Sequence, residues 1–234
     1  SRELLEPSKD DGTRTFDDEG DVGVLRTWRA MCPELQERWP EAARPEQWRG
    51  VTMENGRVVK LELEDFGLTG AVPAEICRLS ALKMLDLNNN KLTSVPAEIG
   101  QLTSLEILNL HGNQLTSVPA EIGQLTSLEW LHLSANDLTS LPAEIGRLTS
   151  LEMLDLDHNQ LTSVPAEIGQ LASLEQLGLN GNQLTSVPAE IGQLTSLTQL
   201  YLNDNKLTSL PAAIRELRAA GCYVQLGVGV TFDE

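Results

Sequence analysis

The residues of this sequence best suited to chemistry are its three histidines and two nearby aspartates. His111, His132 and His158 are the only histidines, and the last follows Asp155 and Asp157 closely. Imidazole and carboxylate groups can transfer protons, and together they suit zinc, which needs ligands within about 2.0–2.2 Å. The five residues follow no spaced ligand motif, so we expect no metal here. We interpret them as polar contact residues, some of which titrate between about pH 5 and pH 8.

Signatures of catalysis are absent from the sequence. It contains no Gly-rich phosphate loop with a lysine, no HExxH motif and no GxSxG motif. The repeats described below place the histidines on an open sheet surface, which excludes water poorly and disfavours acid/base catalysis. We therefore expect no enzymatic activity and no cofactor.

Composition excludes further classes of function. The 234 residues hold 34 Asp and Glu against 17 Lys and Arg, which gives a net charge of −17. Nucleic-acid binding requires clustered basic residues, so no nucleic-acid partner is expected. No apolar stretch approaches the ~20 residues of a membrane span, so no membrane association is expected. The cysteines Cys32, Cys77 and Cys222 lack CxxC spacing, which favours free thiols and a reducing, cytoplasmic location.

An internal repeat supplies the elements that position these residues. Its 23-residue units begin at Leu92, Leu115, Leu138, Leu161 and Leu184, after a 24-residue unit at Leu68. Each unit contains Leu-x-x-Leu-x-Leu-x-x-Asn, in which two leucines at a spacing of two lie on one face of a strand. One unit cannot bury that face alone, so stacked units must share a continuous core.

Two other repeated residues have predicted structural roles. The Asn after each strand, such as Asn113 or Asn136, is expected to be buried and to bond backbone groups of adjacent coils. Pro96 and Pro119 precede Ala-Glu-Ile-Gly, which suits a turn into a short helix that ends at Gly.

The pattern L-x-x-L-x-L-x-x-N-x-L resembles the leucine-rich repeat, and the 23-residue unit is most similar to the plant-type and Ras-group classes. Residues 48–51, Trp-Arg-Gly-Val, are similar to the amino-terminal cap of plant leucine-rich-repeat receptors, although residues 46–47 and 52–53 lack that cap's cysteines. The resemblance implies an α/β solenoid, a curved horseshoe with about eight parallel strands on its concave face. Short helices or 3-10 turns would form the convex face.

We expect four segments along the chain. Residues 1–19 would be an acidic, mobile tail, 20–57 a helical N-terminal cap, 58–206 the leucine-rich repeats and 207–234 a C-terminal capping repeat. Caps are needed because terminal coils would otherwise expose leucines. In the last segment a helix is expected to end at Gly221, with Val224 and Leu226 in a final strand.

Differences among the five 23-residue units identify a candidate binding face. Positions are counted from the first leucine of each unit. Eighteen of the 23 positions show at most one deviation among the five copies, and only positions 16, 18, 20, 21 and 23 vary freely. Four of these surround the strand on its solvent side. Because the exposed convex positions show one change, Arg147, drift does not explain the pattern, and the alternatives to selection for binding are gene conversion of the other positions or a designed consensus sequence. We interpret the variable surface as a binding face on a rigid scaffold.

Position 16 carries Met84, Ile107, Trp130 and Met153 on successive strands. Such an exposed apolar stripe marks an interaction site, and Trp130, with Tyr201 further along, is the candidate hot spot. The alternative is that the stripe only covers strand edges. The predicted partner-binding residues are Met84, Asp86, Ile107, Asn109, His111, Trp130, His132, Met153, Asp155, Asp157, His158, Gln176, Tyr201 and Asn203.

We therefore predict a non-catalytic module that binds a protein or peptide on its concave face. The resemblance implies a scaffold or recognition role in signalling or innate recognition. The acidic residues around the stripe favour a partner with basic groups. Two alternatives stay open, a substrate-recruiting part of a larger kinase or ubiquitin ligase, and a self-associating structural repeat protein.

Overall fold

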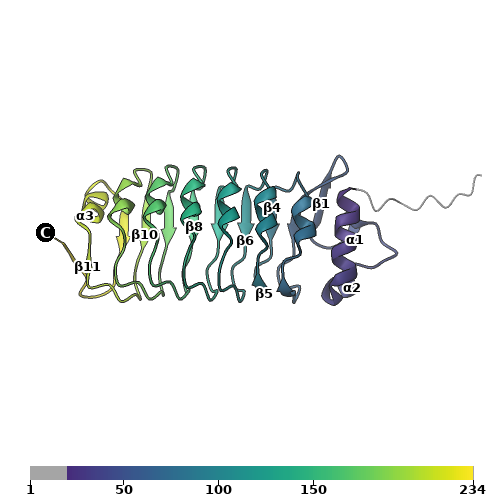
Figure 1. Ribbon diagram of the computed structural model, residues 1–234, viewed down its shortest axis with the longest axis horizontal. Coiled ribbons are helices and arrows are strands. Elements are labelled where there is room, and N and C mark those ends of the chain that lie inside the picture. The colour runs from purple at the N-terminus through teal and green to yellow at the C-terminus, as the bar shows by residue number, and fades with distance from the viewer. Residues whose placement is uncertain (1–19, 234) are drawn as a thin grey trace, which may run out of the picture.

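Each repeat unit forms one coil, with a short strand on one side and a 3-10 helix on the other. The computed structural model describes residues 20–233, so the predicted tail at 1–19 lies outside the described residues. In Figure 1 the coils stack side by side along the long axis, with helices toward the viewer and strands behind them. The strands and the helices therefore form opposite faces of a solenoid.

Nine strands form the main sheet of the described residues. In spatial order they are β1 (Val51–Glu54), β2 (Arg57–Glu62), β4 (Met84–Asp86), β6 (Ile107–Asn109), β7 (Trp130–His132), β8 (Met153–Asp155), β9 (Gln176–Gly178), β10 (Gln199–Tyr201) and β12 (Tyr223–Gln225). Only β1 is antiparallel to its neighbour, which leaves eight parallel strands. This confirms the predicted leucine-rich-repeat architecture.

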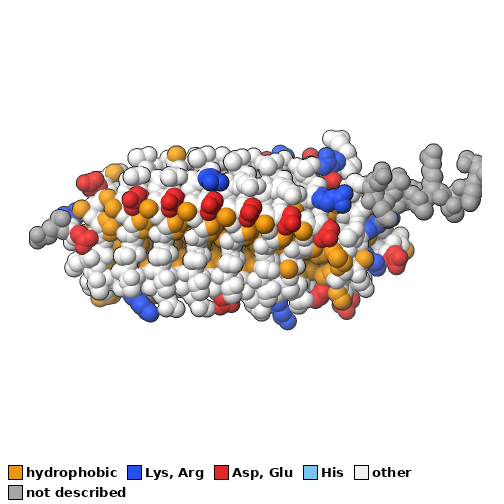
Figure 2. Space-filling model, viewed as in Figure 1, with side chains coloured by type: hydrophobic (Ala, Val, Ile, Leu, Met, Phe, Trp, Pro, Cys, Tyr) orange, Lys and Arg blue, Asp and Glu red, His pale blue; other side chains and the backbone are white. Residues whose placement is uncertain are grey.

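The opposite, convex face consists of short 3-10 helices. They are η2 (Ala74–Arg78), η3 (Ala97–Gln101), η4 (Ala120–Gln124), η5 (Ala143–Arg147), η6 (Ala166–Gln170) and η7 (Ala189–Gln193). Each has one glutamate in its first turn, and Figure 2, which views this face, shows a row of acidic side chains across the coils. Every one of these helices carries the same glutamate, so this acidic row does not differ from one coil to the next.

The repeated glycine lies within a 3-10 helix, not at its end. Gly146 is inside η5, and a Cβ atom there would lie 2.4 Å from the carbonyl oxygen of Glu167 in the next coil. A residue without a side chain is needed where two coils approach so closely. The prediction that this glycine ends the helix is therefore wrong, and its role is to let the coils pack.

The repeated asparagines are buried and bridge adjacent coils. Asn113 donates from Nδ2 to the carbonyl oxygens of Leu87, in the preceding coil, and Leu110, at 3.0 and 3.1 Å. Its Oδ1 accepts the backbone N–H of Leu92 at 2.9 Å. The same pattern recurs at Asn90, Asn136, Asn159 and Asn182. These contacts confirm the predicted role.

The N-terminal end of the stack is covered by α1 (Asp21–Met31), α2 (Pro33–Arg38) and η1 (Pro45–Gln47). Trp39 joins them, since its ring is stacked on Trp48 at 4.8 Å and meets Trp28 edge-on at 6.2 Å. Among the described residues, no helix has the length and apolar character needed to cross a membrane.

The cap also contains a hairpin that the prediction of a helical segment at 20–57 missed. Strand β1 returns through Asn55 and Gly56, both with positive φ, and pairs with β2. Asn-Gly is the sequence typical of such a two-residue hairpin turn, so the signal was present.

The C-terminal end is covered by α3 (Ala212–Ala219) and the strand β12. The strand ends at Gln225, so the prediction that it includes Leu226 is wrong, although Leu226 still packs partly against the core. Two smaller pairs complete the structure, β3 (Thr69–Ala71) with β5 (Lys91–Ser94) and β11 (Ser209–Leu210) with β13 (Thr231–Phe232).

Candidate binding face

The register of the sheet places the predicted apolar residues directly side by side. Met84 pairs with Ile107, Ile107 with Trp130, and Trp130 with Met153. Neighbouring strands lie about 4.8 Å apart, so the four side chains form a continuous stripe. Trp130 is 42% exposed and the other three are half-buried. The stripe therefore packs partly on itself and still presents a large indole to water.

The same row continues to a tyrosine that sequence reasoning missed. Gln176 and Gln199 follow Met153, and Tyr223, which is 58% exposed, follows Gln199. Its ring lies 6.1 Å from that of Tyr201 in an edge-on arrangement. A signal existed, because Tyr223 precedes Val224 just as each position-16 residue precedes the first leucine of its strand.

A polar row runs beside the apolar stripe. Its members in register are Glu62, Asp86, Asn109, His132, Asp155, Gly178, Tyr201 and Gln225. The residues at position 20 form the next row. Two of them contact predicted residues, since Ser134 bonds to Asp155 and Asn180 bonds to Asp157. The sequence predicted that position 20 belongs to the variable surface but did not select these two residues, because only the packed side chains reveal the contacts.

Ser134 connects two of the predicted residues. Its hydroxyl donates to Oδ2 of Asp155 at 2.7 Å, while Nδ1 of His111 lies 2.8 Å from the Ser134 Oγ. A hydroxyl has one hydrogen, so Nδ1 of His111 must be the donor in the second bond. A nucleophilic serine would instead give its proton to histidine, and this arrangement opposes that chemistry.

Asp155 is fixed in its ionised form by its neighbours. Burial opposes ionisation, but the side chains of His132 and Ser134 and the backbone N–H of Asp157 hold the pKa of Asp155 below its ordinary value. Nδ1 of His132 lies 3.9 Å from Oδ2 of Asp155, an ion pair when the imidazole is protonated.

Asp157 has the opposite shift. Burial raises its pKa, and the charge of Asp155 acts in the same direction. Its oxygens accept the backbone N–H and the Nδ2 of Asn180 at 2.8 and 2.9 Å. The Oδ1 of Asn180 in turn accepts the N–H of Asn203 at 3.2 Å, so one chain of bonds crosses three coils.

Position 21, whose residue type differs from one unit to the next, is constrained by its backbone. Its residues Asp65, Asn89, Gly112, Ala135, His158, Gly181 and Asp204 all have φ between 52° and 64°. Only residues that tolerate left-handed φ fit there, so the variation has a structural limit. The side chain of His158 lies over Gly181, where a Cβ atom would approach its Nδ1 to 2.5 Å.

The histidines and acids do not assemble a metal centre in the part of the chain that the structure describes. Within residues 20–233, no group of three or more His, Cys, Asp or Glu side chains is arranged to hold a metal ion. His111 and His132 approach Asp155, one through Ser134, whereas the ring of His158 lies over Gly181 and acts on Asp157 only through its charge.

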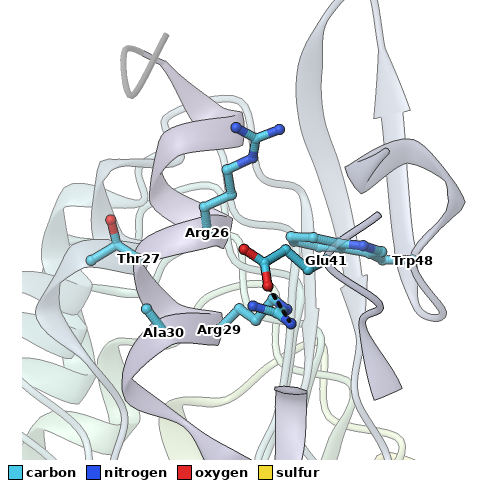
Figure 3. Close-up of a pocket in the computed structure, with 6 residues that line it drawn as sticks. All are labelled: Arg26, Thr27, Arg29, Ala30, Glu41 and Trp48. Atoms are coloured by element: carbon cyan, nitrogen blue, oxygen red, sulfur yellow. Dashed lines mark ion pairs between the residues drawn. The ribbon is translucent and has the colours of Figure 1, made fainter. Parts of the chain in front are cut away.

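A cavity of about 510 Å³ lies on the cap, away from the concave face (Figure 3). It is lined by Arg26, Thr27, Arg29, Ala30, Glu41 and Trp48. Arg29 donates from Nε to the carbonyl oxygen of Trp39 at 2.6 Å, and its ion pair with Glu41 is long, at 4.0 Å. The glutamate side chain is 90% exposed, so water weakens this pair.

Comparison with known families agrees with the geometry. The family model described as "Leucine-rich repeat region" matches residues 54–164, and "Leucine Rich repeats (2 copies)" matches residues 172–215. No curated protein sequence matches the chain.

Solved structures give similar neighbours. An LRR protein of Leptospira interrogans is 36% identical with a TM-score of 0.55, covering 74% of this chain and 55% of its own. The LRR ectodomain of the Arabidopsis thaliana receptor kinase GASSHO1/SCHENGEN3, in complex with CASPARIAN STRIP INTEGRITY FACTOR 2, is 30% identical with a TM-score of 0.78. That match covers 90% of this chain and 27% of the ectodomain.

The Arabidopsis receptor kinase HAESA, whose ectodomain was solved with an IDA peptide hormone, is 28% identical with a TM-score of 0.63. The match covers 91% of this chain and 41% of that ectodomain. The chain thus spans about half the length of the Leptospira protein and less than half of these plant ectodomains.

Proposed function

Since the chain belongs to the leucine-rich-repeat family, we propose that it is a non-catalytic binding module that recognises a protein or peptide on its concave face. The observation that carries this proposal is the apolar stripe, in which an exposed Trp130 lies between Ile107 and Met153 on a surface that faces water. A large apolar side chain in such a place costs free energy unless a partner covers it. Indole groups are also frequent among residues that dominate binding energy.

Charge defines the kind of partner. Positions 16, 18, 20 and 21 of the concave face carry the acids Glu62, Glu64, Asp65, Asp86, Asp155, Asp157 and Asp204 and one lysine, Lys60. A surface of this sign attracts a partner with basic groups and speeds its approach. One of the structural neighbours, HAESA, holds a peptide hormone, which supports a peptide or an extended protein segment as the partner.

The finer assignments are also proposals. The 23-residue units and the Trp-Arg-Gly-Val segment at 48–51 favour plant-type or Ras-group repeats with a plant-receptor-like cap. From this similarity we assign a role in signalling or innate recognition, either alone or as the recruiting part of a larger protein.

The cysteines support a cytoplasmic location. Cys32, Cys77 and Cys222 are free thiols, and burial raises the pKa of Cys32 to about 11 and of Cys77 to about 12. Thiols with such pKa values stay protonated and react slowly near neutral pH. Free thiols are typical of reducing compartments, and residues 46–47 and 52–53 lack the cysteines of the plant-receptor cap that this segment resembles.

An affinity capture with three baits tests the binding face. The baits are the wild type, a concave variant with Trp130→Ala and Met153→Ala, and a convex control with Glu121→Gln and Gln124→Ala, all shown to fold by circular dichroism. We expect quantitative mass spectrometry of lysate from the source organism to find proteins retained by the wild type and the convex control and lost by the concave variant. Equal capture by all three baits would contradict the proposal. Capture of a second copy of this protein by the wild-type bait would favour self-association.

A further inference from the structure

Two carboxylates converge beside the apolar stripe. A Cβ atom on Gly178 would lie 2.8 Å from Oδ1 of Asp157 and 3.1 Å from Oδ1 of Asp155. The two aspartates therefore occupy the space that a side chain at position 178 would fill. Donors from Ser134 and Asn180 fix them there, so the negative charge is already in place before any partner binds.

The pair has little internal compensation. Among the described residues, only His132 lies within 4.0 Å of either carboxylate as a possible cation, at 3.9 Å from Asp155. Each of the four carboxylate oxygens accepts one hydrogen bond. Asp155 accepts from Ser134 and from the N–H of Asp157, and Asp157 accepts two bonds from Asn180. A carboxylate oxygen has two lone pairs, so acceptor capacity is left for an external donor.

A guanidinium group fits these acceptors better than an ammonium group does. It offers five N–H donors in a planar fork, has no acceptor, and is always charged. The compact, strongly hydrated ammonium of lysine has no such fork and gains less from two neighbouring carboxylates.

The spacing between the two subsites is set by the sheet. Trp130 is in register with Gln176 on β9, two strand spacings or about 9.6 Å away, and Gly178 lies two residues farther along β9, about 6.6 Å. The two positions are therefore about 12 Å apart on a diagonal across the strands. An extended peptide advances about 3.3 Å per residue with alternate side chains on one face, so residues i and i+4 face the same side about 13 Å apart. A peptide lying along this diagonal would thus reach both subsites with side chains four residues apart.

We infer that the partner is an extended peptide segment that places an aromatic or large aliphatic side chain on Trp130 and Met153 and an arginine, four residues away, on the carboxylates of Asp155 and Asp157. This inference rests on the proposed binding function of the concave face. The arginine can lie on either side of the apolar residue in the peptide sequence, because the peptide can run in either direction along the solenoid.

Selection from a library of random twelve-residue peptides displayed on phage tests the inference. Three immobilised baits are compared by deep sequencing: the wild type, Trp130→Ala, and the double variant Asp155→Asn with Asp157→Asn. We expect the wild type to enrich arginine four residues from an aromatic or aliphatic residue. The double variant should lose the arginine and keep the apolar preference, and Trp130→Ala should do the reverse.

The strongest selected peptide is then synthesised with its arginine, with lysine, and with the isosteric neutral citrulline. Fluorescence anisotropy with the wild type should show binding weakened about tenfold or more by citrulline, and by less for lysine. These peptide changes leave the protein untouched, so the test survives even if a protein variant fails to fold.

The outcomes separate the two proposals. Enriched peptides without arginine, or an arginine preference unchanged in the aspartate double variant, would overturn this inference and leave concave-face binding in place. No enrichment over a bait-free control, together with no effect of Trp130→Ala, would overturn this inference and count against peptide binding by the concave face as well. Pairing of the bait with a second copy, seen by light scattering and abolished by Trp130→Ala, would replace the peptide by the chain itself.

Discussion

Ser134 and Asp155 lie on neighbouring coils and share a hydrogen bond of 2.7 Å, in which the serine hydroxyl is the donor. The polar residues of the concave face therefore hold one another across the strands. Such bonds keep the face in one arrangement, which lowers the entropy lost when a partner binds. They also give the face a measurable dependence on pH.

The Ser134→Ala variant should lose stability in a pH-dependent way. The pKa of Asp155 is lowered in the folded state, so its ionised form contributes stability above the unfolded pKa, and that contribution is lost as pH falls through the folded value. Removal of the hydroxyl donor should cost about 1 kcal/mol near pH 7 and less near pH 2. Urea unfolding at both pH values measures this, and an equal loss at both would show that Ser134 does not act through the charge of Asp155.

Asp157→Asn should behave in the opposite sense. The folded-state pKa of Asp157 is raised, so folding favours its protonated form, and this preference is lost as pH rises through the folded pKa. Asparagine removes the buried charge and keeps an oxygen for the N–H of Asn180, but its Nδ2 would face the Nδ2 of Asn180, so one of the two bonds is lost. Because the variant is relieved of the buried charge only where the wild-type carboxyl is ionised, its melting temperature relative to the wild type should be higher at pH 7 than in acid. A relative melting temperature that is lower at pH 7 than in acid would mean that the ionised carboxylate stabilises the fold.

Asn113→Ala should destabilise the solenoid by about 1–3 kcal/mol, because the buried backbone groups of Leu87 and Leu92 lose their partner. Chemical denaturation measures the change in the free energy of unfolding. Gln114→Ala, at the exposed adjacent position, is the matched control and should change stability by less than about 0.5 kcal/mol. Equal effects of the two substitutions would remove the special role of the buried amide.

Much of the scaffold could be predicted because repetition reveals it. The leucines and the asparagine ladder recur at fixed spacing, and their roles follow from burial alone, as Asn113 illustrates. The role of Gly146 was assigned wrongly, since the repeat shows that a glycine is required but not which atom approaches it. The β1 hairpin and Tyr223 were missed because both lie in the caps, where the repeat pattern breaks down.

The candidate site was less predictable than the scaffold. The rows of the concave face follow from strand register, so the alignment of Trp130 with Met153 could be foreseen. The convergence of Asp155 and Asp157 over Gly178 depends on side-chain rotamers and on donors in other coils, which no periodicity encodes. The assignment of these residues to partner binding stays a prediction.

Ala135→Gly should stabilise the protein. Ala135 has φ of 52°, a left-handed conformation that costs a residue with a Cβ atom about 1 kcal/mol, whereas equivalent coils carry Gly112 and Gly181. Because glycine also gains freedom in the unfolded chain, we expect a net gain of less than about 1 kcal/mol in the free energy of unfolding.

The reverse substitution, Gly112→Ala, provides the control for this prediction. It should lower stability, since the new Cβ would also lie 2.6 Å from Oδ1 of Asn89. Loss of stability in Ala135→Gly would show that packing of the alanine methyl group outweighs its backbone strain.

Trp130→Ala should separate binding from folding. The indole is 42% exposed and lies on the outer side of β7, while the buried Leu131 beside it anchors the strand in the core. We expect partner binding, or binding of the selected peptide, to weaken at least about tenfold, because the indole is the largest apolar contact on the face. The free energy of unfolding should change by less than about 1 kcal/mol, since the exposed indole lies outside the buried core. Leu131→Ala is the contrasting variant and should cost about 2–5 kcal/mol of stability. If Trp130→Ala destabilises the protein as strongly as Leu131→Ala, the indole is part of the core, and its exposure on the concave face has no bearing on recognition.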